Sequence, residues 1–397
     1  MQFDQVGADA LMEITSRPDL VFVKGQGSWL EDHQGKRYLD MIQGWAVNAL
    51  GHSPQNVVDA MCKQAATLMN PSPAFYNAPM MELATLITQH SCFDKVFFAN
   101  SGGEANEGAI KLARKWGQKH RDGAFKIITF EHAFHGRTLA TMSASGKAGW
   151  DTIFAPQVDG FPKATLNDID SVRALVDKHT VAIMLEPIQG EGGVIPAEPA
   201  FMQALRQLCD EQNLLLIVDE VQSGMGRTGK LFAYQHSQIE PDIMTLGKGI
   251  GGGVPLAALC AKASVACFEH GDQGGTYNGN PVVTAAGVAV MQTLTADGFM
   301  DSVNQRAQQL SAGLNALSDK WGFKGERGQG LLRALKLDRD MGPALVEAAR
   351  LRQPEGLLLN APRPDLLRFM PALNVSEADL TQALAILNEL IAQARSV

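Results

Sequence analysis

Four short runs of apolar residues restrict the fold of this chain more than any other feature of its sequence. The runs are KIITF at 126–130, VAIMLEP at 181–187, LLLIVDE at 214–220 and DIMTL at 242–246. They have no alternating polar face, and stretches with helical character, such as FMQALRQLCDEQN at 201–213, separate them. Strands of this kind are buried on both faces of a mostly parallel sheet that helices cover. The sequence therefore predicts an α/β fold.

The two ends of the chain follow other patterns. Residues 21–41 alternate apolar and polar positions, which predicts short strands joined by turns. After Pro281 the pattern is helical, with a long amphipathic stretch at 300–320. Ser376 and Asp379 have the spacing of a capping box, so a final helix is expected to begin there. With 397 residues, the chain is long enough for two domains.

Composition excludes several classes of partner. The formal net charge is -8, and no basic excess is available for binding a phosphate backbone. No uncharged apolar run approaches the roughly 20 residues that span a bilayer. Asp4 and Asp9 lie where a secretory signal would be basic and then apolar. The five cysteines have no C-x-x-C spacing. We therefore expect a cytoplasmic protein that binds neither nucleic acid nor membrane.

Two glycine patterns suggest nucleotide binding, and each fails a test. Gly247–Gly252 fits G-x-G-x-x-G, but Gly253, Pro255 and the strand-like LAALCA argue against the helix that must follow. Gly224–Lys230 fits G-x-x-x-x-G-K, but Leu231 stands where a magnesium-binding hydroxyl is required. Neither a dinucleotide site nor a P-loop is the favoured interpretation.

The pair His132 and His135 forms an H-x-x-H pattern. The helical zinc signature requires two histidines four residues apart with a glutamate between them. The spacing here is three residues, and the intervening residues are Ala and Phe. The sequence therefore predicts no metal site.

A helix start offers a candidate anion site. Ser101 and Glu104 have capping-box spacing between the strand-like KVFFAN and the helical ANEGAIKLARKW. The backbone amides of Gly102 and Gly103 would then face an anion at the positive end of the helix. A helix cap without a ligand explains the same residues.

Charged residues follow two neighbouring apolar runs. Asp219 and Glu220 end one run and Lys248 follows another, and open α/β sheets bind ligands at the carboxyl ends of their strands. A partly desolvated lysine can bond covalently to an aldehyde. A structural Asp–Lys ion pair is the alternative. Together with the anion site and Phe134, these residues suit pyridoxal phosphate, which has a phosphate, a pyridine ring and an aldehyde.

Seven segments, in order, resemble those of class III pyridoxal-phosphate aminotransferases over nearly the whole chain. They are SGGEANEGAIKLAR at 101–114, HAFHGRT at 132–138, EPIQGEGG at 186–193, IVDEVQSGMGRTG at 217–229, TLGKGIGGGVPLAA at 245–258, GGTYNGNP at 274–281 and LRFMPALNVS at 367–376. The resemblance implies the fold of type I, with a mostly parallel central sheet that helices cover on both faces. It also implies a large cofactor-binding domain over residues 51–284. A smaller α+β domain would form from residues 1–50 and 285–397.

The resemblance implies that eight residues act at the cofactor. They are Lys248 as the point of covalent attachment, Asp219 at the pyridine nitrogen, Gly102 and Gly103 at the phosphate, Phe134 stacked on the ring, Gln222 near the ring hydroxyl, Glu186 near the cofactor, and Thr276 at the phosphate site of the second subunit in a homodimer. Lys248 and Asp219 would also be the catalytic residues.

The family also implies how substrates are held. Arg137 would bind the substrate α-carboxylate, because a guanidinium matches a carboxylate bidentately. Arg368 would receive a carboxylate of glutamate or 2-oxoglutarate, and Glu191 would neutralise Arg368 when the other substrate is bound. Gly275 would lie near the substrate. A surface charge near the final helix is the alternative for Arg368.

Within the family, the segments are most similar to those of enzymes that act on N2-acetyl-L-ornithine. The expected reaction moves its terminal amino group to 2-oxoglutarate, giving N-acetyl-L-glutamate 5-semialdehyde and L-glutamate in arginine biosynthesis. Other interpretations remain open. They are transamination of succinylornithine, ornithine or 4-aminobutyrate, an aminomutase reaction, and a non-catalytic ligand-binding regulator.

Several positions depart from the family pattern and concern the choice of amine. Gly103 stands in place of a common Thr, Gly275 in place of Ser or Thr, and Asn278 in place of Gly. Trp45 replaces a smaller aliphatic residue and could narrow the mouth of the pocket. Gly44 aligns with a Tyr of ornithine δ-aminotransferases, which weakens the case for free ornithine as the donor.

Overall fold

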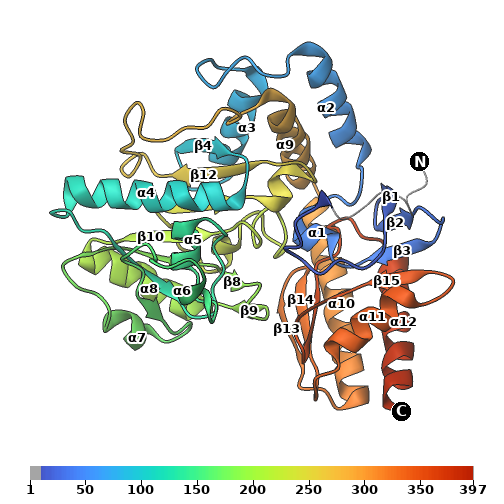
Figure 1. Ribbon diagram of the computed structural model, residues 1–397. Coiled ribbons are helices and arrows are strands. Elements are labelled where there is room, and N and C mark those ends of the chain that lie inside the picture. The colour runs from blue at the N-terminus through green and yellow to red at the C-terminus, as the bar shows by residue number, and fades with distance from the viewer. Residues whose placement is uncertain (1–9, 397) are drawn as a thin grey trace.

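A seven-stranded sheet lies at the centre of the larger part of the molecule (Figure 1). The computed structural model describes residues 10–396, so Asp4 and Asp9 lie outside the described residues. In spatial order the strands are β4 (Lys95–Ala99), β12 (Ala257–Ala261), β11 (Ile243–Leu246), β10 (Leu215–Asp219), β7 (Thr180–Leu185), β5 (Lys126–Phe130) and β6 (Lys163–Ala164). Only β12 runs antiparallel to its neighbours; the pairs from β11 to β6 are parallel. The predicted mostly parallel sheet is confirmed.

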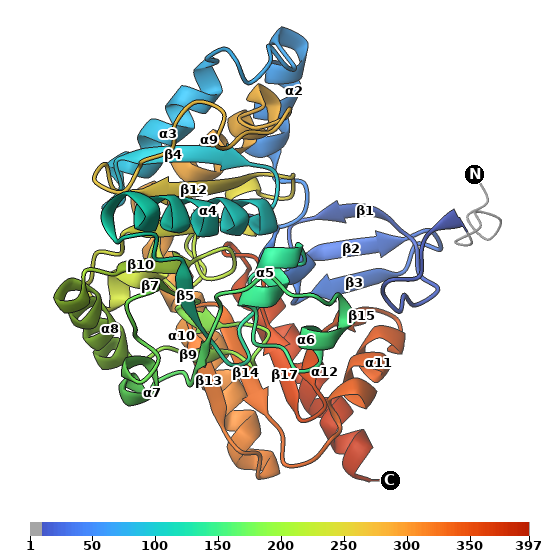
Figure 2. The ribbon, with the colours of Figure 1, turned by 60° about the vertical axis from the view of Figure 1, so that its left-hand side comes forward.

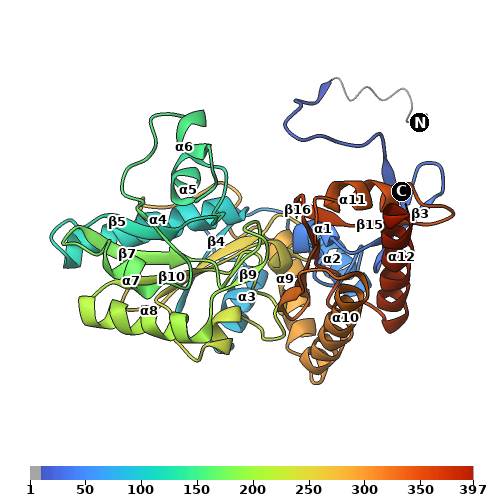
Figure 3. The same ribbon diagram turned by 90° about the horizontal axis from the view of Figure 1, so that it is seen from below.

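Helices cover both faces of this sheet, because alternate residues of a strand point in opposite directions. In β10, Leu216 and Val218 belong to one hydrophobic cluster with helix α8 (Pro199–Gln212). Leu215 and Ile217 belong to a second cluster with helix α4 (Gly102–His120). Figure 3 shows α4 and α8 on opposite sides of β7 and β10. This is the two-faced burial that the apolar runs predict.

Local signals predicted where three helices begin or end. The Ser101 hydroxyl accepts from the backbone N–H of Glu104, and the Glu104 carboxylate accepts from that of Ser101, at the start of α4. Ser376 caps α12 (Glu377–Arg395) by accepting from the backbone N–H of Asp379 at 3.0 Å. The amphipathic stretch near 300–320 forms α10 (Phe299–Trp321).

Two smaller sheets build the other part of the molecule (Figure 2). The first has the strands β1 (Phe22–Gln26), β2 (Trp29–Asp32), β3 (Arg37–Asp40) and β15 (Gly356–Leu358), and the second has β13 (Glu326–Gln329), β14 (Leu332–Lys336), β17 (Leu366–Phe369) and β16 (Asn360–Arg363). Because β15 pairs with β3 in parallel, the two ends of the chain meet in one sheet. This pairing supports the division into residues 51–284 and the two flanking segments, which stays a prediction.

The remaining elements connect or cover these sheets. The longer helices are α2 (Gln55–Thr67), α3 (Ala78–Gln89), α9 (Pro281–Leu294) and α11 (Gly342–Leu351). The short elements are α1 (Gln43–Ala46), α5 (Leu139–Ala144), α6 (Trp150–Ile153), α7 (Ile169–Arg173), β8 (Ile188–Gln189), β9 (Ile195–Pro196), η3 (Ala233–His236) and η4 (Lys248–Gly251). Helices α2 and α3 both pack against α9.

Within residues 10–396, no single helix is both long enough and apolar enough to cross a membrane. Helices α9 and α10 meet the combined requirement for length and apolar composition only when taken together, and they are bent by 76° at their junction.

The glycine-rich segment Gly247–Gly252 does not begin an α-helix. Its residues Lys248–Gly251 form the single 3-10 turn η4, and the chain then extends into β12. The prediction that no dinucleotide-type helix follows these glycines is confirmed.

Candidate active site

The carboxyl ends of the parallel strands bring the predicted residues together. Asp219 is the last residue of β10, Glu186 follows β7 directly, and Lys248 lies two residues beyond β11. A cavity of about 180 Å³ opens at this edge. Its lining residues are Gly102, Gly103, Asn106, Phe134, His135, Gly136, Glu186, Glu191, Asp219, Val221, Gln222 and Lys248. This edge is where open α/β sheets bind ligands.

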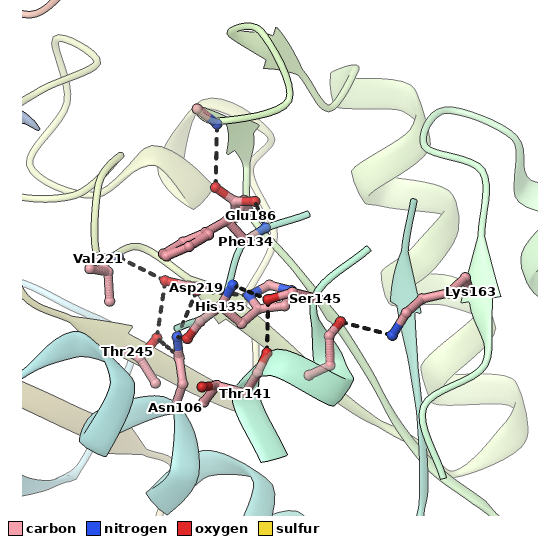
Figure 4. Close-up of polar contacts among 12 residues, drawn as sticks. Asn106, Phe134, His135, Thr141, Ser145, Lys163, Glu186, Asp219, Val221 and Thr245 are labelled. Atoms are coloured by element: carbon pink, nitrogen blue, oxygen red, sulfur yellow. Dashed lines mark hydrogen bonds and ion pairs between the residues drawn. The ribbon is translucent and has the colours of Figure 1, made fainter. Parts of the chain in front are cut away.

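The Asp219 carboxylate is buried and surrounded by donors (Figure 4). Its Oδ2 accepts from Asn106 Nδ2 at 2.8 Å and contacts His135 Nδ1 at 2.8 Å. Its Oδ1 accepts from the backbone N–H of Val221 at 3.0 Å. An ionised carboxylate, which only accepts, satisfies all of these contacts. The arrangement therefore places a fixed negative charge at the base of the cavity.

Lys248 is held in a strained conformation beside this charge. Its φ of +46° lies in the left-handed region, which costs a non-glycine residue about 1–2 kcal/mol. Among residues 10–396, none forms a hydrogen bond or ion pair with its Nζ. Burial lowers the pKa of the Lys248 ammonium, although the charge of Asp219 opposes that effect. The neutral amine is thereby made more available for bonding to an aldehyde or for moving a proton.

Glu186 is a buried carboxyl group next to the same cavity. Its Oε1 accepts from the backbone N–H of Phe134 at 2.9 Å, and its Oε2 accepts from that of Gly190 at 3.3 Å. Burial, together with the nearby charge of Asp219, raises the pKa of Glu186 from 4.5 to about 8. Glu186 therefore carries a proton at neutral pH in the cofactor-free protein.

This raised pKa predicts a pH-dependent loss of stability. The folded protein keeps the Glu186 proton up to a pKa of about 8, whereas the unfolded chain releases it near 4.5. The stabilisation is therefore complete below pH 4.5 and lost as the pH rises through about 8, by roughly 3–5 kcal/mol in total. The variant Glu186→Gln cannot ionise at this position. We therefore expect the Tm of cofactor-free Glu186→Gln minus the Tm of the cofactor-free unsubstituted protein to be larger at pH 9 than at pH 5.

Calorimetry at pH 5 and at pH 9 measures the Tm of both proteins. The exposed Glu347, substituted as Glu347→Gln, serves as the control and should give the same Tm difference at both pH values. A pH-independent difference for Glu186→Gln would contradict the raised pKa.

Arg368 lies in β17 and its side chain is completely buried. The interpretation of Arg368 as a surface charge is therefore wrong. Its Nε donates to Asn360 Oδ1 at 2.8 Å, and its Nη1 lies 2.8 Å from Glu191 Oε1. The geometry of this ion pair does not meet the angle requirements of a hydrogen bond. Within residues 10–396, neither Nη1 nor Nη2 of Arg368 therefore has a hydrogen-bond acceptor. Buried guanidinium donors of this kind suit a carboxylate ligand.

Arg137, Gly275 and Thr276 are not among the residues that line the cavity. The exposed Arg137 has its guanidinium carbon 5.8 Å from the ring centre of Phe134 and 5.4 Å from that of Trp150. Gly275 and Thr276 lie in the exposed loop between β12 and α9 and do not line the cavity. The structure of one chain therefore does not bring these two residues to Lys248.

Gln222 and Trp45 meet near the cavity. Nε2 of Gln222 donates to the backbone carbonyl of Trp45 at 3.5 Å, whereas the Trp45 side chain is about half exposed and does not line the cavity. The effect of Trp45 on the pocket mouth stays a prediction.

His132 and His135 are set aside as metal ligands by their spacing, and residues 10–396 contain no group of ligands to replace them. Within the described part of the chain, no three or more His, Cys, Asp and Glu side chains are grouped so that they could hold a metal ion.

Sequence reasoning missed Asn106 and Thr245. The Thr245 hydroxyl donates to Asn106 Oδ1 at 2.6 Å, and Asn106 in turn donates to Asp219. A signal for Asn106 exists, because it is a polar residue on the buried face of α4 between Ala105 and Ala109. Threonine is common in β-strands, so Thr245 gives no such signal in the sequence.

The residues at the cavity fit pyridoxal phosphate. A Cβ added to Gly102 would lie 2.6 Å from Val221 Cγ1, so only glycine allows α4 to begin this close to the cavity. The free amides at that helix start suit a phosphate. Asp219 suits a protonated ring nitrogen, Lys248 an aldehyde, and Phe134 and Val221 offer apolar surfaces to a ring.

Comparisons with known proteins agree with this geometry. The family described as Aminotransferase class-III matches residues 13–391. A Bordetella pertussis protein named acetylornithine aminotransferase 2 is 69% identical over 395 residues, covering 100% of both chains. The acetylornithine aminotransferase of Ralstonia nicotianae is 65% identical over 395 residues, covering 98% of this chain and 99% of the relative.

Two solved structures to which this chain is similar are also aminotransferases. An N-acetylornithine aminotransferase from Stenotrophomonas maltophilia has a TM-score of 0.83 and 34% identity, covering 96% of this chain and 97% of that one. An ornithine aminotransferase from Toxoplasma gondii has a TM-score of 0.92 and 30% identity, covering 98% and 94%. On the evidence of its sheet order, of the charged residues gathered at one sheet edge and of these matches, this chain belongs to the class III aminotransferases, pyridoxal-phosphate enzymes of fold type I.

Proposed function

We propose that this chain transfers the terminal amino group of N2-acetyl-L-ornithine to 2-oxoglutarate, giving N-acetyl-L-glutamate 5-semialdehyde and L-glutamate in arginine biosynthesis. The observation that carries the proposal is the pairing of the buried Arg368 with Glu191 beside the Lys248 cavity. With this pair, one site can bind a substrate that has a second carboxylate on Arg368, and can bind a substrate without one while Arg368 stays paired with Glu191. The names of the full-length relatives at 69% and 65% identity support the choice of donor.

The residues at the cavity would have separate roles in binding the cofactor and in moving protons. When bound, pyridoxal phosphate supplies an aldehyde that takes up the amino group and a protonated ring that accepts electrons from the reacting carbon. Lys248 would hold the cofactor through Nζ and, once released, move a proton at the substrate carbon as general base and then acid. Asp219 would keep the ring nitrogen protonated, and the amides of Gly102 and Gly103 would bind the phosphate.

The arginines would orient the substrates. Arg137 would hold the carboxylate that is remote from the reacting carbon, which is the α-carboxylate of acetylornithine and the distal carboxylate of 2-oxoglutarate. Acetylornithine has no second carboxylate, so Glu191 would stay on Arg368 while the donor is bound. With 2-oxoglutarate, Glu191 would swing away and the second carboxylate would take its place. The 39% exposure of the Glu191 side chain supports this movement, because a partly exposed side chain can move into solvent.

Substitution of Arg368 is expected to separate the two half-reactions. In Arg368→Gln, the half-reaction with 2-oxoglutarate should slow about 100-fold at limiting substrate, because a charge-assisted contact is worth about 1.5–3 kcal/mol. The half-reaction with acetylornithine should change less than threefold. Single-turnover absorbance of the cofactor measures each half-reaction separately.

Arg363→Gln, in the neighbouring strand β16, is the matched control and should leave both rates unchanged. Equal losses in the two half-reactions of Arg368→Gln would show that Arg368 does not discriminate between the substrates.

A panel of amines tests the proposed donor. Purified holoenzyme is offered acetylornithine, succinylornithine, ornithine, lysine and 4-aminobutyrate, and kcat/KM is measured for each with 2-oxoglutarate. We expect acetylornithine to rank first, with ping-pong kinetics. Ornithine is the second candidate, because a solved ornithine aminotransferase superposes with a TM-score of 0.92. A higher kcat/KM for ornithine would overturn the proposal for the donor while leaving the transaminase in place.

We also propose that two copies of the chain form a homodimer in which Thr276 completes the phosphate site of the partner. Thr276 is exposed and does not line the cavity of its own chain, and both observations support this arrangement. Several large apolar side chains in that loop, in α3 and in the segment just before α3 are also exposed. They are Phe75, Tyr76, Met81 and Tyr277.

A mixing experiment tests the shared site. Lys248→Ala and Thr276→Ala subunits are each expected to be impaired alone, but a mixed dimer contains one site built entirely from unsubstituted residues. Co-expression should therefore restore up to half of the unsubstituted activity per dimer. No gain over the two separate variants would contradict a site shared between subunits.

We further propose that the protein works in the cytoplasm. In support, all five cysteines are free and form no disulfide with one another.

A further inference from the structure

We propose that Asn106 and Thr245 are positioning residues for Asp219: the Thr245 hydroxyl orients the Asn106 amide, and that amide fixes which oxygen of Asp219 receives the ring nitrogen of the cofactor. The inference rests on the proposed function and deepens it. It concerns three buried residues from three different elements, Asn106 of α4, Asp219 of β10 and Thr245 of β11.

The contacts of Asn106 allow one orientation of its amide. Thr245 Oγ1 donates to Asn106 Oδ1 at 2.6 Å. The Nδ2 group donates to Asp219 Oδ2 at 2.8 Å and to the backbone carbonyl of His135 at 2.7 Å. A flipped amide would place its oxygen against two acceptors and lose both bonds. The hydroxyl of Thr245 thus holds the amide with both N–H groups on acceptors.

The donors around Asp219 leave capacity on one oxygen only. Oδ2 receives Asn106 Nδ2 and His135 Nδ1, which occupy its two lone pairs. Oδ1 receives the backbone N–H of Val221. Thr245 Oγ1 also lies 3.4 Å from Oδ1, but its single proton is already engaged in the shorter bond to Asn106. One acceptor position on Oδ1 therefore remains for a protonated ring nitrogen.

Burial makes this arrangement effective. Thr245 is completely buried and Asn106 and His135 are each 1% exposed, so water does not compete for these hydrogen bonds. In such surroundings hydrogen bonds to a charge are strong, and an unmade bond is costly. Asn106 also lies one turn from the Gly102 end of α4, and Thr245 lies three residues before Lys248. The network therefore links the segments that would hold the phosphate, the ring nitrogen and the aldehyde.

Two substitutions at Thr245 separate the hydroxyl from the shape of the side chain. Thr245→Val keeps the volume and removes the hydroxyl, whereas Thr245→Ser keeps the hydroxyl and removes a methyl group. The first readout is the 15N chemical shift of bound pyridoxal phosphate labelled at the ring nitrogen, which reports protonation of that nitrogen. The second is the equilibrium dissociation constant of the cofactor, and the Tm of each cofactor-free variant checks its folding.

We expect Thr245→Val to weaken cofactor binding about tenfold and to move the 15N shift towards that of a neutral pyridine. Thr245→Ser should keep the unsubstituted shift and bind within about twofold. Asn106→Leu, which removes the amide, should exceed Thr245→Val in both effects.

Three results would overturn the inference. Unchanged binding and 15N shift in Thr245→Val would do so, as would equal effects of Thr245→Val and Thr245→Ser. If the unsubstituted protein does not bind pyridoxal phosphate at all, the proposed function fails, and the inference fails with it. If that protein binds the cofactor with a protonated ring and Thr245→Val does the same, only the positioning role is lost.

Discussion

Lys248→Ala is expected to lower kcat by about 10⁴-fold or more. The variant loses both the amine that bonds to the cofactor aldehyde and the group that moves the proton, and positioned acid–base catalysis alone contributes about 10²–10⁴-fold. No other lysine lines the cavity, so none of the described residues offers a substitute amine there. Lys248→Arg keeps the positive charge near Asp219 and should be equally inactive, because guanidinium does not deprotonate in proteins.

A covalent readout accompanies the kinetics. Borohydride reduction of the loaded protein, followed by peptide mass mapping, should place a pyridoxyl group on the peptide that contains Lys248 and on no peptide of Lys248→Ala. The distant Lys63→Ala serves as a control and should keep both the label and full activity. An unlabelled Lys248 in fully loaded protein would refute the assignment of this lysine.

Asp219→Asn is expected to lower kcat about 10³-fold, comparable to the loss of a preorganised charge-stabilising group elsewhere. The substitution keeps the shape of the side chain but removes the negative charge that would keep the ring nitrogen protonated. It also places an amide opposite the donors Asn106 Nδ2 and Val221 N, at least one of which then meets a like group. Steady-state kinetics and the 15N shift of the bound cofactor measure the two consequences.

The control for this variant is Asp170→Asn, because the Asp170 side chain is 86% exposed and remote from the cavity. It should have unsubstituted kinetics. Turnover within tenfold of normal in Asp219→Asn would contradict the role given to the carboxylate.

The central strands could be predicted because their signal is local. KIITF has the same bounds as β5, and the run LLLIVDE at 214–220 extends one residue beyond β10 at each end. A strand buried on both faces must be apolar throughout, and this requirement is visible in five consecutive residues. The nearness of Asp219 and Lys248 followed from the same argument, because parallel strands bring their carboxyl ends to one edge.

The polar surroundings of the site could not be predicted in this way. The hydrogen bonds that join Asn106 to Asp219 and to Thr245 connect residues separated by 113 and 139 positions. Their formation depends on side-chain directions to within fractions of an ångström, which spacing along the chain does not define. The complete burial of Arg368 likewise depends on how β17 packs, and the segment LRFMPALN is equally compatible with an exposed arginine.

The order and period of apolar residues determined by themselves that this chain forms a helix-covered, mostly parallel sheet with Asp219 and Lys248 at one edge, because these patterns depend on neighbours close in sequence. Only the tertiary structure decided which donors surround Asp219, that Glu186 is buried with a raised pKa, that Arg368 is completely buried, and that Thr276 does not line the cavity of its own chain. Each of these depends on distances between elements far apart in the chain, and packing of the whole molecule sets those distances.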